Sequence, residues 1–224
     1  MNKIWYLSPS NQKANEGIGG YGTEHEQMYL LADAIIPHLD RAGVSFVLAD
    51  RDATLAQRAK ESNKIGAGFH FCLHSNAGGN GKAWGPVALY YSDAGKEFGE
   101  KLVDSLLALG QKNNRSYNIK QEKGLYELRK TVAPACLLEV DFHDSSTGVE
   151  FMTRRRSEIA RAIAAVIIEA DGKQFVPETP GDAADKCVAW GLMDPGRWAD
   201  PLTREEAAVL AVRLKELIEK ELNK

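Results

Sequence analysis

The sequence predicts an α/β protein, with a mostly parallel twisted sheet that helices flank on both faces and a small C-terminal helical module. Short apolar runs typical of strands alternate along the chain with longer segments of helical periodicity. These runs are nearly continuous, as expected for strands that are covered on both faces. The chain has 224 residues, of which 44% are hydrophobic and 26% charged, so it has room for one full domain and a small second module.

The elements are expected in a regular order. A first strand over Lys3–Leu7 precedes a long polar loop, Ser8 to Thr23, which is rich in glycine. From Glu24 the apolar residues recur at helical spacing, and Pro37 predicts a kink or a stop in this helix. The remaining expected elements are a strand over 44–48, a polar helix over 53–65, a strand over 68–73, a strand over 87–91, a helix over 95–109, a strand over 135–140 and a helix over 150–170.

The composition divides the chain into three parts. Residues 1–172 carry the alternating pattern, and residues 173–181 form a linker that contains two prolines. Residues 182–224 are expected to form a helix-loop-helix, in which Thr203 and Glu206 fit a capping box at the second helix. Two helices alone bury little apolar surface, so we expect this module to pack on the main domain or form a homo-oligomer.

Charge and composition exclude several classes of protein. A formal net charge of -3 provides no basic face for nucleic acid. The apolar runs are much shorter than the ~20 residues that span a bilayer. The N-terminus reaches Ser8-Pro9-Ser10 before a signal-peptide core of ~7–15 apolar residues forms, so the chain is expected to be cytoplasmic as encoded. The three cysteines lack a Cys-x-x-Cys pair, which argues against a disulfide framework and a thiolate zinc finger.

Two residues suggest a metal site. His74 ends an expected strand and Glu24 begins the first long helix. In α/β sheets reactive groups gather where loops leave the carboxyl ends of strands, and zinc accepts both imidazole and carboxylate ligands. The alternatives are a hydrogen-bonded or surface histidine and a glutamate that only stabilises the helix N-terminus.

Glu139 lies near the end of an apolar strand. Burying a carboxylate in such a strand costs several kcal/mol unless it is paired or bound to a metal. Glu139 is therefore a candidate functional residue, and the alternative is a salt bridge to Arg129 or another basic residue.

Five segments of the chain form a recognisable pattern in their order and spacing. They are Gly22-Thr23-Glu24-His25-Glu26, Arg58 to Asn63, Phe71-Cys72-Leu73-His74-Ser75-Asn76-Ala77, Leu125-Tyr126-Glu127-Leu128-Arg129 and Pro134 to Phe142. Together they resemble the zinc-dependent N-acetylmuramoyl-L-alanine amidases over roughly residues 1–172. The resemblance implies a zinc-activated water that cleaves the amide between the lactyl group of muramic acid and L-alanine. It implies Glu24 and His74 as zinc ligands and Glu139 as the catalytic glutamate.

The chain departs from the family pattern at the first zinc ligand. The family has a histidine just after the first strand, where this chain has Asn11, and a neutral amide is an uncommon zinc ligand. We expect His143 to be the third ligand, although a straight strand would place it ~13 Å from Glu139, so the chain must turn sharply after Phe142. Asp141, Asn11 and water are the alternatives.

The resemblance implies a peptidoglycan hydrolase that acts on the cell wall after release or export, as phage endolysins do. The alternatives are a non-catalytic wall-binding protein that has lost a competent zinc site, and another metal-dependent hydrolase of small amides. Trp190-Gly191-Leu192 and Leu202-Thr203-Arg204-Glu205-Glu206 make the C-terminal module resemble a single surface-layer-homology-like repeat. The resemblance implies binding to a wall polymer as the alternative to packing on the main domain or on a second copy of the chain.

Overall fold

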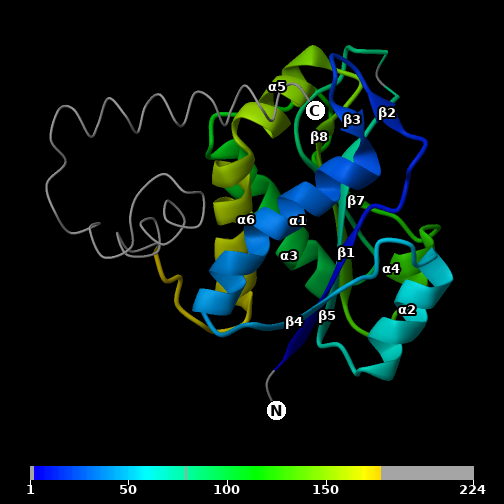
Figure 1. Ribbon diagram of the computed structural model, residues 1–224, viewed down its shortest axis with the longest axis vertical. Coiled ribbons are helices and arrows are strands. Elements are labelled where there is room, and N and C mark those ends of the chain that lie inside the picture. Colours follow the sequence, from blue (N-terminus) through cyan, green and yellow to red (C-terminus); the bar gives the residue numbers. More distant parts are fainter. Residues whose placement is uncertain (1–2, 79, 178–224) are drawn as a thin grey trace, which may run out of the picture. The chain divides into compact units, whose positions relative to one another are not determined.

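The computed structural model describes residues 3–78 and 80–177 (Figure 1). The predicted C-terminal module and residues 178–181 of the predicted linker lie outside the described residues, so the predictions made for them stay predictions. The first of two compact units ends at Val176.

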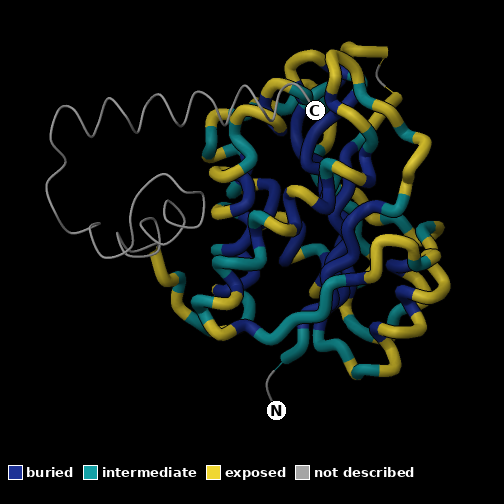
Figure 2. Tube along the Cα trace, viewed as in Figure 1, coloured by how far each residue is buried: buried dark blue, intermediate teal, exposed yellow. Residues whose placement is uncertain are grey.

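A six-stranded sheet forms the centre of this unit, in the order β4-β1-β5-β8-β6-β7. Neighbouring strands are parallel except for β6, which is antiparallel to β8. Buried residues concentrate along the central strands (Figure 2). The strands are β1 (Ile4–Pro9), β4 (Ser45–Leu48), β5 (Phe69–Asn76), β6 (Val87–Tyr90), β7 (Ile119–Gln121) and β8 (Ala135–Phe142).

Helices cover both faces of the sheet, which confirms the predicted α/β class. Helices α1 (Glu24–Arg41), α3 (Asp93–Leu107) and α6 (Arg156–Ala170) pack together over the large core, which contains Trp5, Phe71 and Leu138. Helices α2 (Leu55–Lys64) and α4 (Tyr126–Lys130) contact each other on the opposite side in Figure 1. A smaller cluster of Cys72, Leu128, Ala135 and Leu137 lies beneath α4.

Two details differ from the expected elements. Pro37 lies inside α1 and does not end it, because Ile35 and Leu39 on either side are buried in the core and offset one missing hydrogen bond. The helix expected over 150–170 is two helices, α5 (Ser146–Arg154) and α6, which meet at Arg155. Both helices bury apolar residues against the same core, so periodicity alone does not reveal the break.

The polar loop between β1 and α1 contains a short two-stranded ribbon of β2 (Glu16–Gly17) and β3 (Gly22–Thr23). Gly22 has φ +82°, a left-handed conformation that favours glycine, and Thr23 then caps α1. Thr23 Oγ1 accepts a hydrogen bond from the Glu26 backbone N–H, and the Glu26 carboxylate accepts one from the Thr23 N–H. This capping box fixes the first residue of the helix, Glu24.

Candidate active site

His74 and Glu139 lie side by side on one face of the sheet. The parallel register of β5 and β8 pairs His74 with Glu139, and paired residues on parallel strands point to the same face. Both lie near the carboxyl ends of their strands, as the sequence predicts. Beyond this pair the register of the two strands shifts. Asn76, two residues after His74, pairs with Phe142, which lies three residues after Glu139. Such a bulge redirects the side chains that follow it.

Glu24 reaches the same place from the first turn of α1. Its Oε1 atom lies 2.8 Å from His74 Nδ1. The Ser75 backbone N–H also donates to Oε1 at 3.4 Å, and Asn15 Nδ2 donates to Oε2 at 3.0 Å. Both members of the pair are buried, with Glu24 only 1% exposed. The structure therefore brings together the two residues that the resemblance implies as metal ligands.

Glu24 and His74 each favour the charged form of the other. Burial works against the carboxylate, but the hydrogen bond and charge of His74 lower the pKa of Glu24. Burial also works against the imidazolium, while the hydrogen bond from His74 to Glu24 and the nearby carboxylates raise the pKa of His74.

Glu139 has the opposite electrostatic environment. Burial raises the pKa of its carboxyl to about 7, the charge of His74 lowers it, and the charge of Glu24 raises it. The residue keeps some exposure, but its Oε2 atom is buried without a hydrogen-bond partner in the described part of the chain. Arg129 is exposed and makes no ion pair with Glu139, so the salt-bridge alternative is not observed.

A pocket of about 180 Å³ lies over His74 and Glu139. Asn11 and Gln12, from the loop after β1, line it, and α4 supplies Glu127. The rest of its lining is mostly leucine, from α2, β6, β8 and the segment around α4: Leu55, Leu89, Leu125, Leu128 and Leu137. Asn11, the residue that replaces the histidine of the family, is therefore part of the candidate active site.

His143 follows β8 and is buried next to Ser75. Its Nδ1 atom lies 2.9 Å from Ser75 Oγ, and its ring stacks on Tyr21 with a centroid distance of 6.1 Å. Its carbonyl accepts a hydrogen bond from the Ile18 N–H at 3.0 Å, which ties the glycine-rich loop to the end of β8. These contacts do not include Glu24 or His74. The role of His143 as third ligand stays a prediction.

The donor chemistry of the site fits a metal cation in part. Glu24 and His74 supply a carboxylate and an imidazole, and His74 Nε2 is buried without a partner in the described part of the chain. Residues 3–78 and 80–177 do, however, contain a group of three potential ligands whose donor atoms all lie within 4.8 Å of one another. This group is His70, Cys72 and Glu127, and it includes neither Glu24 nor His74. The described residues therefore supply two close ligands at Glu24 and His74.

Sequence reasoning missed a buried polar network behind the pocket. Glu127 Oε1 accepts hydrogen bonds from Ser8 Oγ at 2.6 Å and from His70 Nε2 at 3.0 Å. Arg58, which is fully buried, donates to Ser8 Oγ at 3.2 Å and to the Tyr29 hydroxyl at 3.0 Å. The sequence signal for this network was Glu127, a single glutamate between Leu125 and Leu128. Only the fold shows that His70 faces it.

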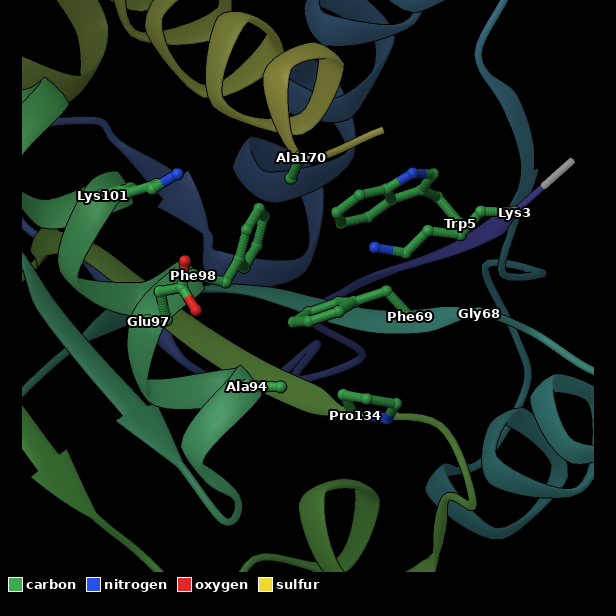
Figure 3. A pocket seen from close by; sticks show the side chains of 10 residues that line it. All are labelled: Lys3, Trp5, Gly68, Phe69, Ala94, Glu97, Phe98, Lys101, Pro134 and Ala170. Atoms are coloured by element: carbon green, nitrogen blue, oxygen red, sulfur yellow. The ribbon is translucent and has the colours of Figure 1, made fainter. Parts of the chain in front are cut away.

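A second pocket, of about 230 Å³, lies at the opposite ends of the strands (Figure 3). The rings of Trp5, Phe69 and Phe98 pack against one another there, with centroids 4.6–5.2 Å apart. Lys3 extends over the Trp5 ring, 4.3 Å from its centroid. This pocket begins at the amino ends of β1 and β5, away from His74 and Glu139, and does not form part of the candidate active site.

Comparisons with known proteins agree with this geometry. Residues 8–169 match the family model of N-acetylmuramoyl-L-alanine amidase. No curated relative matches the chain. No helix among the described residues is long and apolar enough to cross a membrane.

Solved structures share the fold at low sequence identity. The amidase AmiC2 of Nostoc punctiforme has a TM-score of 0.68 and 20% identity, over 76% of this chain and 97% of that one. The catalytic domain of the amidase CwlV from Bacillus (Paenibacillus) polymyxa has a TM-score of 0.66 and 20% identity, over 75% and 97%. The catalytic domain of the CD27L endolysin, which targets Clostridia difficile, has a TM-score of 0.63 and 22% identity, over 79% and 100%.

Proposed function

Because the chain belongs to the N-acetylmuramoyl-L-alanine amidase family, we propose that it is a peptidoglycan hydrolase that cleaves the amide between N-acetylmuramic acid and L-alanine with a zinc-activated water. One observation supports this most directly. A buried carboxyl with a raised pKa, Glu139, lies beside His74, and His74 is paired with Glu24. Such pairings of a perturbed carboxyl with a metal-ligating set are typical of hydrolytic sites.

Glu24 and His74 would hold the zinc, with His143 proposed as a third ligand. When bound, zinc polarises the amide carbonyl and lowers the pKa of its water, which allows attack near neutral pH. A metal binds imidazole only in its neutral form, so a protonated His74 must lose a proton when zinc binds, and zinc affinity should fall as the pH falls.

Glu139 would move the proton. Its carboxylate takes a proton from the attacking water and passes it to the departing alanine amine. Burial raises the pKa of Glu139 above that of an exposed glutamate, toward the range in which a general acid and base works best near neutral pH. We further propose that the chain acts on the cell wall after release or export.

The test combines metal analysis with a wall digest. We expect the purified chain to contain zinc and to release muropeptides with free L-alanine amino groups, as read by mass spectrometry. Glu139→Gln should keep zinc but lower turnover by at least ~100-fold, the lower end of the range for a general base. Near-normal turnover in this variant would rule out the role of Glu139. A wild-type chain that binds wall but neither holds zinc nor cleaves it would support the non-catalytic alternative.

A further inference from the structure

His70, Cys72 and Glu127 form a second group of potential metal ligands, further along β5 toward its amino end than His74. His70 and Cys72 lie two residues apart on β5, so their side chains point to the same face of the sheet as that of His74. Glu127 approaches this face from α4. The proposed reaction assigns none of the three residues a role.

The spacing of these three side chains suits one small cation. Their donor atoms, a ring nitrogen, a sulfur and a carboxylate oxygen, all lie within 4.8 Å of one another. His70 Nε2 and Glu127 Oε1 are 3.0 Å apart. Zinc bonds of ~2.0–2.3 Å in a tetrahedral site place neighbouring donor atoms ~3.3–3.8 Å apart. Side-chain shifts of about 1 Å therefore suffice for one ion to bind all three donors.

The hydrogen bonds around this group hold it in place but leave it incomplete. Glu127 Oε1 also accepts a hydrogen bond from Ser8 Oγ at 2.6 Å, and the His70 ring stacks on Tyr6 at a centroid distance of 5.0 Å. His70 is 0% exposed, and its Nδ1 atom is buried without a hydrogen-bond partner in the described part of the chain. A buried ring nitrogen of this kind is rare in folded proteins unless a water molecule or an ion satisfies it.

The chemistry of the three donors determines which class of cation they can bind. Thiolate and imidazole are ligands of zinc and other transition metals, and zinc also accepts carboxylate. Calcium and magnesium prefer sites made of oxygen atoms alone. A buried site is least costly when its charges cancel, and a zinc ion, the Cys72 thiolate and the Glu127 carboxylate are together neutral. The donor set therefore favours zinc.

An ion can reach this group from the pocket over Glu139. Glu127 is 5% exposed and lines that pocket. Leu128 and Leu137 line it too, and on their other side they pack around Cys72. The group therefore lies directly behind the pocket wall, and Glu127 belongs to both.

We propose that His70, Cys72 and Glu127 bind a zinc ion, at a site separate from the one proposed at Glu24 and His74. This second ion joins β5 to α4 and so fixes the helix that forms one wall of the pocket. Its role is structural, and it does not depend on the proposed amidase function.

Cobalt(II) in place of zinc reports on the second site directly, because a thiolate bound to cobalt(II) gives an intense charge-transfer absorption that nitrogen and oxygen ligands do not give. The full chain is stripped of metal with a chelator and titrated with cobalt(II). We expect this absorption in the wild-type chain and in His74→Ala. It should disappear in Cys72→Ala, because the only sulfur ligand of the proposed site is then lost.

The other two cysteines provide the controls. Cys136 is as buried as Cys72 and lies on the neighbouring strand, but it belongs to the large core on the other face of the sheet. Cys136→Ala should keep the absorption, and so should Cys187→Ala, which changes the cysteine outside the described residues.

A ligand on another element keeps the test independent of the cysteine variants. Glu127→Gln has nearly the same shape as wild type and should weaken cobalt binding at least ~10-fold, since even the loss of a residue that only supports a metal ligand has that effect. Thermal unfolding shows whether each variant folds. Zinc should raise the unfolding midpoint of His74→Ala, in which only the second site remains, and should not raise that of the double variant His74→Ala, Cys72→Ala.

The outcomes separate this inference from the proposed function. A folded wild-type chain without the charge-transfer absorption, or an absorption that persists in Cys72→Ala or is lost in Cys187→Ala, would overturn the second site. Unchanged cobalt affinity in folded Glu127→Gln would also overturn it. If the absorption behaves as expected but the wild-type chain releases no L-alanine amino groups from cell wall, the amidase assignment fails and the second metal site stands.

Discussion

At Glu139, burial and charge oppose each other. The carboxyl lies beside a leucine-rich wall, which favours the neutral acid, while His74 favours the carboxylate. The result is a pKa of about 7, well above that of an exposed glutamate. In the unfolded chain the same carboxyl loses its proton near pH 4.5. The folded protein therefore binds one more proton than the unfolded chain between these pH values.

This difference makes the stability of the zinc-free protein depend on pH. A raised folded-state pKa contributes stability that is fully present below the unfolded pKa and is lost as the pH rises through about 7. Glu139→Gln cannot ionise, so it should match wild type near pH 4.5. Above pH 7 it should be more stable, by on the order of 1–3 kcal/mol.

Thermal unfolding in chelator at a series of pH values measures this. Glu100→Gln removes an exposed carboxyl and serves as the control. A Glu139→Gln curve parallel to wild type from pH 4.5 to pH 8 would contradict the buried-carboxyl interpretation.

His143 has two possible roles that zinc binding separates. As the predicted third ligand, its loss in His143→Ala should reduce zinc affinity about as much as His74→Ala, because the ligands of a site act together. Asn11→Ala should keep zinc. Competition titration of the three variants with a chromogenic chelator measures the affinities. Full zinc affinity in His143→Ala would leave it the structural role that its contacts with Ser75 and Tyr21 describe.

Among the elements, α5 approaches the end of β8 most closely at Gly148. A Cβ atom at this position would lie 2.3 Å from the Phe142 carbonyl oxygen and 2.6 Å from Asp141 Oδ1. The first of these is a backbone atom of the last residue of β8, which pairs with Asn76 of β5, so it cannot move away alone. Glycine here lets the helix pack directly on the strand end that carries the site.

Gly148→Ala should therefore destabilise the protein by about 1–3 kcal/mol, the usual cost of inserting an atom into a packed core. Thr147→Ala changes an exposed neighbour in the same helical turn and should change stability little. Chemical denaturation of both variants measures the difference. Wild-type stability in Gly148→Ala would show that α5 can withdraw from the strand at no cost.

At the scale of the whole molecule, residues near the end of the first unit complete the large hydrophobic core. Trp5 Nε1 donates to Asp171 Oδ1 at 2.9 Å, which joins the start of β1 to the end of α6. Phe175 packs on this core against His38, with a ring-centroid distance of 5.5 Å. All these contacts lie before Val176, where the unit ends.

A chain that ends at Val176 should therefore fold on its own and cleave a soluble muropeptide. A chain that ends at Gly172 loses Phe175, and it should unfold a few degrees lower, since a partly buried phenylalanine contributes about 1–2 kcal/mol. Thermal unfolding of both truncations gives the comparison. Equal midpoints would show that Phe175 contributes nothing, and aggregation of the longer chain would show that the unit needs residues beyond it.

Local sequence was sufficient for most of the longer elements, but it did not predict the short elements β7 and α4. Apolar runs and helical spacing predicted β1, β5, β8 and α1, because burial imposes these periods directly on the sequence. His74 and Glu139 stood out because a polar residue that ends an apolar strand needs a partner. The hydrophobic pattern did not predict the antiparallel direction of β6 or the helix break at Arg155. Neither strand direction nor a change of helix axis alters which residues are buried.

The assembly of the site depended on contacts between residues far apart in the chain. The register of β5 against β8 pairs His74 with Glu139, and the capping box at Thr23 sets Glu24 against His74. The Ser8–Glu127–His70 network joins three elements whose residues, taken singly, look like ordinary core or surface positions. The hydrophobic pattern around a residue indicates the type of element and whether the residue is buried. The partner that stabilises a buried charge depends on strand register and helix packing, and these exist only in the folded chain.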